Sequence, residues 1–201
     1  PKQVDCCLEF LHGNPDSLKV VDPVMGDNGK PYSTYTPELI RRMKELVDAA
    51  DVITPNLTET CMLLGEECPP VMSVAQARSW LARLSDKPGI VVIKGVPLID
   101  DDGQKLSNVG FDKESGSFWR IDWDHIPVHY PGTGDIFTSV LTASLLKGES
   151  LPIALNRATT FTEIAVKTTY SYGTEPRLGV LFEDCLSWLM TNTVLCDYRK
   201  L

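Results

Sequence analysis

The run Gly89-Ile90-Val91-Val92-Ile93-Lys94-Gly95 constrains the fold more than any other part of the sequence. Four consecutive β-branched residues are typical of a strand that is buried on both faces, and such strands belong to parallel sheets covered by helices. Shorter apolar runs at residues 18–21 and 51–54 predict two further strands. Helical patterns separate these runs, so we expect an α/β fold: a doubly wound, mostly parallel sheet with helices on both faces.

The predicted helices carry recognisable start and stop signals. Thr36 is a predicted N-cap with Pro37 at the first helical position, Asn56 opens a helix that Gly65 ends, and Ser73 opens another. The complete set of predicted helices lies at residues 2–13, 36–48, 57–64, 74–84, 135–147, 151–171 and 180–191. Alternation at 117–123, after a turn at 112–116, predicts antiparallel edge strands.

Composition excludes some partners. A net charge of −8 over 201 residues argues against a nucleic-acid partner. No apolar run approaches the roughly 20 residues that a membrane helix needs, so no membrane partner is expected. The six cysteines form no C-x-x-C pair, and we interpret them as reduced, which indicates a cytoplasmic protein. The length fits one domain. The sequence opens on a helical pattern, so we expect the first strands of the sheet to be absent.

The turn Gly132-Thr133-Gly134-Asp135 is the strongest candidate for a chemical site. Glycines let backbone N–H groups approach a ligand, and the first turn of the helix that follows presents unpaired N–H groups and the positive end of the helix dipole. This combination predicts a phosphate site. An aspartate there would repel phosphate unless it does chemistry, so we interpret Asp135 as a base that accepts the proton of an attacking hydroxyl. The alternative is a simple turn and helix start.

Three further loops are expected at the same rim of the sheet, because ligands of doubly wound sheets bind at the carboxyl ends of the strands. They are residues 22–27, residues 54–59 and Lys94-Gly95. Carboxylates in the first two loops can supply the oxygen ligands that Mg²⁺ prefers, directly or through water. A structural alternative stays open for each loop, since Asp22 also suits a strand end and Asn56 with Glu59 suits a capping box.

Three motifs in this order carry a resemblance to a known family: Asp22-Pro23-Val24-Met25-Gly26-Asp27, Thr54-Pro55-Asn56-x-x-Glu59 and Gly132-Thr133-Gly134-Asp135. Together they resemble the ribokinase superfamily, specifically its vitamin kinase branch, and most closely the pyridoxal kinases. The resemblance covers nearly the whole chain. It implies that residues 1–201 are the C-terminal two-thirds of a single ribokinase-like kinase domain whose N-terminal part is absent.

The resemblance implies a role for the residues of each motif. Asp135 corresponds to the catalytic base, which also contacts the substrate, and Tyr35 to an aromatic residue near the substrate. The anion hole corresponds to Gly132, Thr133 and Gly134. The residues on the metal side are Asp22, Asp27, Thr54 and Glu59. The residues on the ATP side are Asn56, Lys94, Gly95, Ile126 and Val128, of which the last two are equally well explained as core strand residues.

The activity that the resemblance implies is transfer of the γ-phosphoryl group of ATP to the 5′-hydroxymethyl of pyridoxal, pyridoxine or pyridoxamine. Mg²⁺ is the implied cofactor, a monovalent cation is an optional second ion, and a homodimer is the implied assembly. Kinases of hydroxymethylpyrimidine or its phosphate, from thiamine synthesis, are the first alternative; Asp27 after Gly26 and Ile136-Phe137 after Asp135 favour pyridoxal. A sugar kinase and a non-catalytic fragment of such a kinase are the remaining alternatives.

Overall fold

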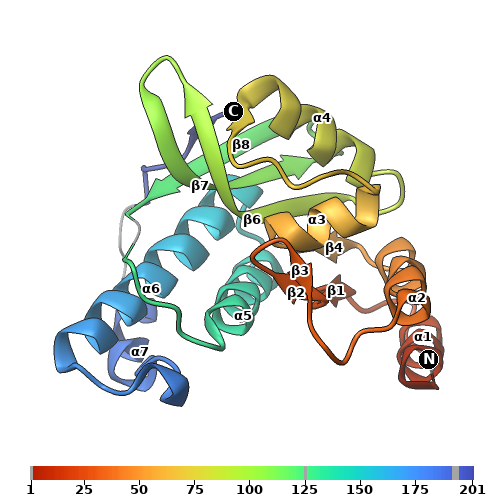
Figure 1. Cartoon of the computed structure of the whole chain (residues 1–201), viewed down its shortest axis with the longest axis horizontal. Coiled ribbons are helices and arrows are strands. Elements are labelled where there is room, and N and C mark those ends of the chain that lie inside the picture. Colours follow the sequence, from red (N-terminus) through yellow and green to blue (C-terminus); the bar gives the residue numbers. More distant parts are fainter. Residues whose placement is uncertain (1, 125, 192–194) are drawn as a thin grey trace.

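The computed structural model describes residues 2–124, 126–191 and 195–201, which form a main sheet with helices on both faces (Figure 1) and a separate two-stranded hairpin. The expected α/β fold is confirmed. Among these residues the main sheet has seven strands, in the order β1 (Val20–Val21), β4 (Val52–Ile53), β6 (Ile90–Asp100), β7 (Gly103–Asp112), β8 (Ser117–Trp123) and β9 (Arg199–Lys200), with β5 (Met72–Ser73) on the far half of β6. Strands β1, β4, β5 and β6 pair in parallel, and the pairs from β6 to β9 are antiparallel.

Two hydrophobic cores lie on opposite faces of this sheet. Val52 and Val92 belong to one core, whereas Ile53 and Val91 belong to the other, because neighbouring side chains of a strand point to opposite faces. The helices on the Ile53 face are α1 (Lys2–Gly13), α2 (Pro37–Asp48), α3 (Leu57–Leu64) and α4 (Val74–Leu84); those on the Val52 face are α5 (Thr133–Leu146) and α6 (Leu151–Tyr172). Burial on both faces explains the unbroken apolar run at residues 90–93.

The predicted helix caps are confirmed. The side-chain oxygens of Thr36 and Ser73 accept hydrogen bonds from the first turns of α2 and α4. Asn56 and Glu59 form a reciprocal capping box at the start of α3, and Gly65 ends that helix in the left-handed conformation, with φ of 70°. In the described part of the chain no helix has both the length and the apolar character that crossing a bilayer requires.

Two predicted boundaries are wrong. Strand β6 does not end at Gly95 but continues to Asp100, with a register shift against β7 between Ile93 and Val96. Gly95 lies within this shift with φ of 66°, so it forms a bulge rather than a strand end. Residues 180–191 do not form one helix either. That region holds the short turn η2 (Glu183–Cys185) and the single-turn helix α7 (Leu186–Leu189), and another short turn, η1 (Pro176–Leu178), precedes it.

A small hairpin that we did not predict follows β1. Strands β2 (Gly26–Asp27) and β3 (Lys30–Pro31) pair in antiparallel fashion through the two-residue turn Asn28-Gly29. Both turn residues have positive φ, at 51° and 76°, as a tight hairpin requires. The hairpin stands at the rim of the sheet, beside the start of α3.

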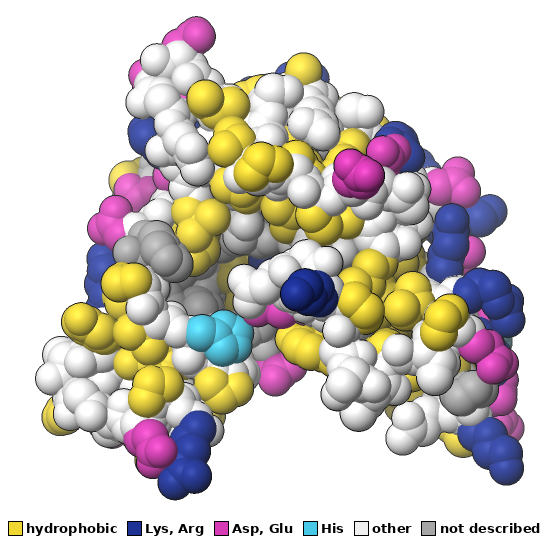
Figure 2. Space-filling model, viewed as in Figure 1, with side chains coloured by type: hydrophobic (Ala, Val, Ile, Leu, Met, Phe, Trp, Pro, Cys, Tyr) yellow, Lys and Arg dark blue, Asp and Glu magenta, His cyan; other side chains and the backbone are white. Residues whose placement is uncertain are grey.

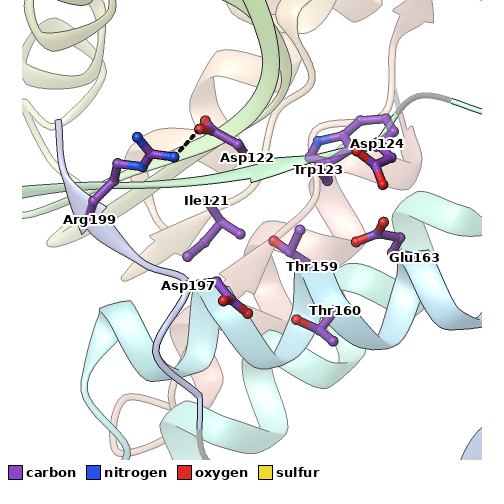
Figure 3. Close-up of a pocket in the computed structure, with 9 residues that line it drawn as sticks. All are labelled: Ile121, Asp122, Trp123, Asp124, Thr159, Thr160, Glu163, Asp197 and Arg199. Atoms are coloured by element: carbon purple, nitrogen blue, oxygen red, sulfur yellow. Dashed lines mark ion pairs between the residues drawn. The ribbon is translucent and has the colours of Figure 1, made fainter. Parts of the chain in front are cut away.

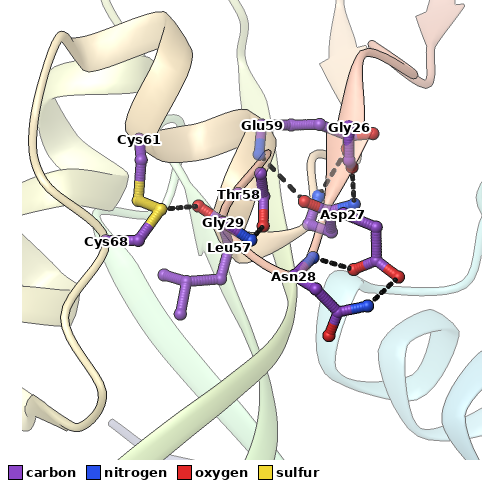
Figure 4. Close-up of a disulfide and its surroundings, with 10 residues drawn as sticks. Gly26, Asp27, Asn28, Gly29, Leu57, Thr58, Glu59, Cys61 and Cys68 are labelled. Atoms are coloured by element: carbon purple, nitrogen blue, oxygen red, sulfur yellow. Dashed lines mark hydrogen bonds between the residues drawn. A yellow bond between two sulfur atoms is a disulfide. The ribbon is translucent and has the colours of Figure 1, made fainter. Parts of the chain in front are cut away.

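The interpretation of six reduced cysteines is wrong for one pair, because Cys61 and Cys68 form a disulfide (Figure 4). The left-handed Gly65 ends α3 and turns the chain back, so that the two Cα atoms lie 5.6 Å apart although the cysteines are seven positions apart in sequence. Cys6, Cys7, Cys185 and Cys196 are free. The argument from cysteines to a cytoplasmic protein loses this part of its support.

Candidate active site

The carboxyl ends of the parallel strands bring the predicted loops together at one rim of the sheet. Asp22 directly follows β1 and Thr54 directly follows β4, and the backbone N–H of Thr54 donates to the Val21 carbonyl at 3.2 Å. Lys94 lies in β6, where its N–H donates to the Pro55 carbonyl at 2.9 Å and its backbone forms a parallel bridge with Asn56. This is the place at which doubly wound sheets bind ligands.

An ion pair between Asp22 and Lys94 occupies the centre of this rim. The Nζ atom of Lys94 donates to both carboxylate oxygens of Asp22 at 2.9 Å, and the two side chains are 14% and 13% exposed. The hydroxyl of Thr138, on α5, donates to Asp22 Oδ2 at 3.3 Å and lies 2.9 Å from the hydroxyl of Thr54, which is fully buried. Sequence reasoning missed Thr138, which lies one helical turn after the glycine motif.

The glycine motif lies directly over this ion pair. A Cβ atom at Gly134 would come within 3.2 Å of Lys94 Nζ and 3.7 Å of Asp22 Oδ2, so the absence of a side chain at this position permits the close approach. Gly132 is the N-cap of α5 with φ of 88° and makes no side-chain capping bond, so the first N–H groups of α5 keep their capacity to bind an anion. Asp135 lies in the first turn of this helix and is exposed.

Glu59 is buried behind the rim and links α3 to the β2–β3 hairpin. Its Oε1 accepts from the Met25 N–H at 3.2 Å and its Oε2 from the Asn56 N–H at 2.7 Å, while Asn56 Nδ2 donates to the Gly26 carbonyl at 2.9 Å. On the same helix, Thr58 accepts the Gly29 N–H at 2.9 Å (Figure 4). Asn56 and Glu59 are therefore a capping box that also fixes the hairpin to the site.

The buried position of Glu59 changes its acidity. Burial is the largest cause and raises its pKa to about 7, with Asp22 adding in the same direction. Hydrogen bonds from the backbones of Asn56 and Met25 and the charge of Lys94 oppose the increase. With the side chain 2% exposed, burial outweighs these contacts. Glu59 is thus a group that exchanges a proton near neutral pH beside the predicted phosphate site.

The two tyrosines near the hairpin, Tyr35 and Tyr32, differ in how deeply they are buried. Tyr35, the predicted substrate contact, is half-buried against the core on the α2–α4 face, and burial followed by the charge of Glu59 raises its pKa. Tyr32 is exposed, and its pKa is raised by burial first and then by the charges of Asp27 and Glu59. The charges of Asp27 and Glu59 thus act on Tyr32, although its sequence context gave no signal beyond its distance of three residues from Tyr35.

Asp27 and Gly95 have partners within the protein. Asp27 accepts from the backbone and side-chain nitrogens of Asn28, at 2.8 and 3.1 Å, and its Oδ2 lies 3.9 Å from Nδ1 of His129. The Gly95 N–H donates to Asn108 Oδ1 at 2.9 Å. The amide of Gly95 is therefore already bonded, whereas Asp27 faces the segment that leads into the glycine motif.

The donor set fits Mg²⁺ carried by a phosphate ligand better than a cage made of protein alone. Across residues 2–124, 126–191 and 195–201, no group of three or more His, Cys, Asp or Glu side chains is arranged to hold a metal. Both Glu59 oxygens accept backbone hydrogen bonds, and both Asp22 oxygens accept from Lys94. Mg²⁺ commonly uses one or two carboxylates together with waters and phosphate oxygens, so Asp27 and water-mediated contacts to Glu59 suit it.

A cavity of about 670 Å³ opens beside Asp135, between α5, α6 and the segment 178–189. Its described lining residues include Gly132, Ile136, Leu178, Val180 and Leu189, and are mostly apolar. Hydrophobic side chains also gather on the outside of this region, at the lower left of the molecule (Figure 2). Ile126 and Val128, which the resemblance placed on the ATP side, are half-buried and are not among the described residues lining this cavity.

A second cavity, of about 430 Å³, lies between β8, α6 and the C-terminal segment (Figure 3). Its acidic residues are Asp122, Asp124, Glu163 and Asp197. Asp122 is paired with Arg199 at 2.8 Å, and Lys167 lies within ion-pair distance of both Asp124 and Glu163. Because these charges are largely paired within the protein and no predicted site residue lines this cavity, we assign it no function.

Comparison with known proteins identifies related sequences. The family model described as phosphomethylpyrimidine kinase matches residues 2–178. The hydroxymethylpyrimidine/phosphomethylpyrimidine kinase of Haemophilus influenzae is 29% identical over 170 residues, covering 85% of this chain and 62% of the relative. Pyridoxal kinase PdxY of Rubrobacter xylanophilus is 31% identical, covering 71% of this chain and 48% of the relative. The chain thus spans less than two-thirds of the length of these curated relatives.

Solved structures agree with these sequence matches. A Bacteroides thetaiotaomicron protein assigned to the phosphomethylpyrimidine kinases, in a crystal form with pyridoxal, superposes with a TM-score of 0.92 at 39% identity, covering 100% of this chain and 71% of that one. Pyridoxal kinase from Lactobacillus plantarum gives a TM-score of 0.79 at 29% identity, covering 93% and 67% of the two chains. Both cover all or nearly all of this chain and leave part of the neighbour unmatched.

Proposed function

Because this chain belongs to the phosphomethylpyrimidine kinase family, in agreement with its resemblance to the vitamin kinase branch of the ribokinase superfamily, we propose that it performs ATP-dependent phosphoryl transfer to a hydroxymethyl group. The observation that carries the proposal is the start of α5. Gly132 there leaves the first N–H groups of the helix open to an anion, and Asp135 lies in the first turn, beside a cavity of about 670 Å³. An anion site with an exposed carboxylate is suited to transferring a phosphoryl group to a hydroxyl.

Each part of the rim has a role in this proposal. The N–H groups at residues 132–134 stabilise the charge of the transferred phosphoryl group. Asp135 accepts the hydroxyl proton of the acceptor as its oxygen attacks phosphorus. Magnesium, when bound with ATP, would neutralise charge on the phosphates. Asp27 would bind this ion directly, and Glu59 would bind it through water. The bonded hairpin and α3 hold these acids in place.

We propose pyridoxal as the acceptor, with pyridoxine and pyridoxamine as related acceptors. The relative in crystals with pyridoxal has 39% identity to this chain, and the Rubrobacter relative is named a pyridoxal kinase. Hydroxymethylpyrimidine or its phosphate is the second candidate, since the family model and the Haemophilus relative carry those names. Pyridoxal and hydroxymethylpyrimidine both present a hydroxymethyl group on an aromatic nitrogen ring, so the chemistry at Asp135 is the same for these two acceptors. In hydroxymethylpyrimidine phosphate the accepting oxygen belongs to the phosphate instead.

The test is Mg²⁺- and ATP-dependent phosphorylation, with pyridoxal and hydroxymethylpyrimidine assayed in parallel on the same protein. We expect the change Asp135→Asn to lower turnover by roughly 10²–10⁴-fold, because general-base catalysis contributes about that much, while leaving ATP affinity nearly unchanged. Asp101→Asn, at an exposed position in the turn between β6 and β7, is the matched control.

The outcomes separate the alternatives. Turnover of pyridoxal that Asp135→Asn abolishes supports both the acceptor and the base. Preferential turnover of hydroxymethylpyrimidine selects the second candidate. ATP binding without phosphorylation of either acceptor would favour a non-catalytic chain, and normal turnover by Asp135→Asn would contradict the assignment of the base. The homodimer stays a prediction, which sedimentation analysis would check. The cytoplasmic location also stays a prediction.

A further inference from the structure

The ammonium of Lys94 lies where the glycine motif, α5 and the ends of β1 and β4 meet. Two of its hydrogen bonds go to the carboxylate of Asp22, at 2.9 Å to each oxygen. The hydroxyls of Thr54 and Thr138 extend the same network of oxygen atoms. A carboxylate surrounded by hydroxyl oxygens is a set of ligands that binds cations. Here the cation beside the Asp22 carboxylate is the ammonium of Lys94.

The position of Lys94 is fixed by its backbone as well as by its charge. Its N–H donates to the Pro55 carbonyl, and the parallel bridge to Asn56 holds β6 against the start of α3. The pair is only 14% and 13% exposed, so water screens it weakly. Removing one partner of such a pair leaves a charge without compensation, which is the costly way to disrupt it.

The same ammonium is close to the predicted phosphate site. The 3.2 Å distance from Nζ to a Cβ position on Gly134 places the charge directly beneath the backbone of the glycine motif. A lysine ammonium has three protons, and the bonds to Asp22 described here use two of them. One proton is left for an oxygen in the anion hole. Without Lys94, Asp22 would present an unpaired negative charge behind an anion site.

We propose that Lys94 is the built-in monovalent cation of this site, with Asp22 as its counter-ion and Thr54 and Thr138 as the supporting oxygens. Asp22 then orients Lys94 rather than binding a metal directly, and the site needs no added monovalent cation. The claim that Lys94 positions a terminal phosphate oxygen rests on the proposed kinase function. The claim that its ammonium replaces a bound cation does not, and it can be tested without turnover.

The first experiment measures thermal unfolding of the full chain as KCl or NH₄Cl replaces choline chloride at constant ionic strength. Lys94→Ala opens the space of the ammonium and leaves Asp22 unpaired, so we expect its Tm in choline chloride to fall by roughly 6–20 °C. K⁺ and NH₄⁺ should restore part of this loss in a saturable manner, because an ion that binds only the folded state stabilises it. The wild type should show no such response.

Two variants serve as controls. Lys94→Met removes the charge but keeps a side chain of similar length in the same space, so K⁺ should not restore its Tm. Lys167→Ala breaks a surface pair with Glu163 and Asp124 in which the lysine is 49% exposed, and it should show no selective response to K⁺. A K⁺ response equal in wild type and Lys94→Ala, or absent from Lys94→Ala, would overturn the proposal.

The second experiment measures ATP affinity by calorimetry with Mg²⁺ in choline chloride and in KCl. The wild type should bind ATP equally in both salts, and a K⁺ requirement greater than about tenfold would overturn the proposal even if Lys94→Ala does not fold. Lys94→Ala should bind ATP about 10–100-fold more weakly in choline chloride and regain affinity with K⁺ or NH₄⁺.

Unchanged affinity in Lys94→Ala would exclude Lys94 as a phosphate-positioning residue while leaving the proposed function intact. Failure of the wild type to bind ATP would contradict the proposed function, while the thermal experiment would still decide the cation question.

Discussion

Replacement of Glu59 by glutamine should change how the stability of the protein depends on pH. Burial raises the pKa of Glu59 from its ordinary value of 4.5 to about 7, so between these values the folded protein holds a proton that the unfolded chain has released. The free energy of unfolding must then fall as pH rises through this interval. The contribution of Glu59 to the free energy of unfolding is therefore fully present below pH 4.5 and is lost once pH exceeds about 7.

The size of the effect follows from the width of the interval. At about 1.36 kcal/mol per pH unit, the interval from 4.5 to about 7 corresponds to about 3 kcal/mol of unfolding free energy. Glu59→Gln removes the titration, so this part of the pH dependence should disappear. The glutamine oxygen can accept from one backbone N–H, but its NH₂ group cannot accept from the other, so near pH 4.5 the variant should be less stable by roughly 1–3 kcal/mol. This deficit should shrink by about 3 kcal/mol as pH rises to about 7, because only the wild type loses stability over that interval.

Urea unfolding of wild type and variant at several pH values between 4 and 8 measures both effects. The quantity to compare is the difference between the two proteins, because other groups also titrate in this range. Glu67→Gln, an exposed glutamate in the loop after the same helix, is the matched control and should leave the pH dependence of the wild type unchanged. Parallel pH profiles for wild type and Glu59→Gln would refute the reasoning, since they would mean that Glu59 holds no proton near neutral pH.

Two further predictions concern the glycine motif and the disulfide. Gly134→Val should weaken ATP binding by at least about tenfold in calorimetry, because an added Cβ would lie 3.2 Å from Lys94 Nζ and the methyl groups would enter the anion site. Gly13→Val, where a Cβ meets nothing within 4 Å, is the control. Normal ATP affinity in Gly134→Val would place the anion site elsewhere. Reduction of the Cys61–Cys68 disulfide should lower the free energy of unfolding by about 2 kcal/mol, from the entropy of closing so short a loop. Urea unfolding with and without a dithiol checks this, and a Cys68→Ser variant that still responded to the dithiol would contradict it.

Local signals predicted most of the fold. The β-branched run at residues 90–93 predicted a strand buried on both faces because only two-sided burial makes such a run favourable. Caps at Thr36, Asn56 and Ser73 fixed helix starts, since their side chains act within three residues. The hairpin at Asn28-Gly29 could also have been predicted, because that dipeptide is a strong signal for a two-residue turn.

Features that depend on distant partners were not predictable in this way. Strand β9 exists because residues 199–200 pair with β8, some eighty residues earlier in the sequence. The apolar pattern at 180–191 indicated a helix, but the segment instead packs in short turns against α6. A glycine such as Gly95 is typical of a strand end, and only pairing with β7 on both sides of it shows that the strand continues.

The site was predicted as a set of loops but not as a set of contacts. The rule that ligands bind at the carboxyl ends of strands brought Asp22, Thr54, Lys94 and the glycine motif to one rim. It could not assign Asp22 to Lys94, because the two residues lie 72 positions apart and their pairing depends on side-chain orientation. Nor could it show that both oxygens of Glu59 are bonded to backbone N–H groups.

The bulge at Gly95 has a consequence for how this strand tolerates changes in length. Ile93 and Val96 are an odd number of residues apart, yet both belong to the core on the α2–α4 face, because β6 has one residue more than β7 between the flanking pairs. Deleting that residue would turn Val96 and Leu98 to the opposite face while Lys94 kept its place. At this point of the chain the number of residues, more than their chemical identity, determines which side of the sheet each later side chain meets.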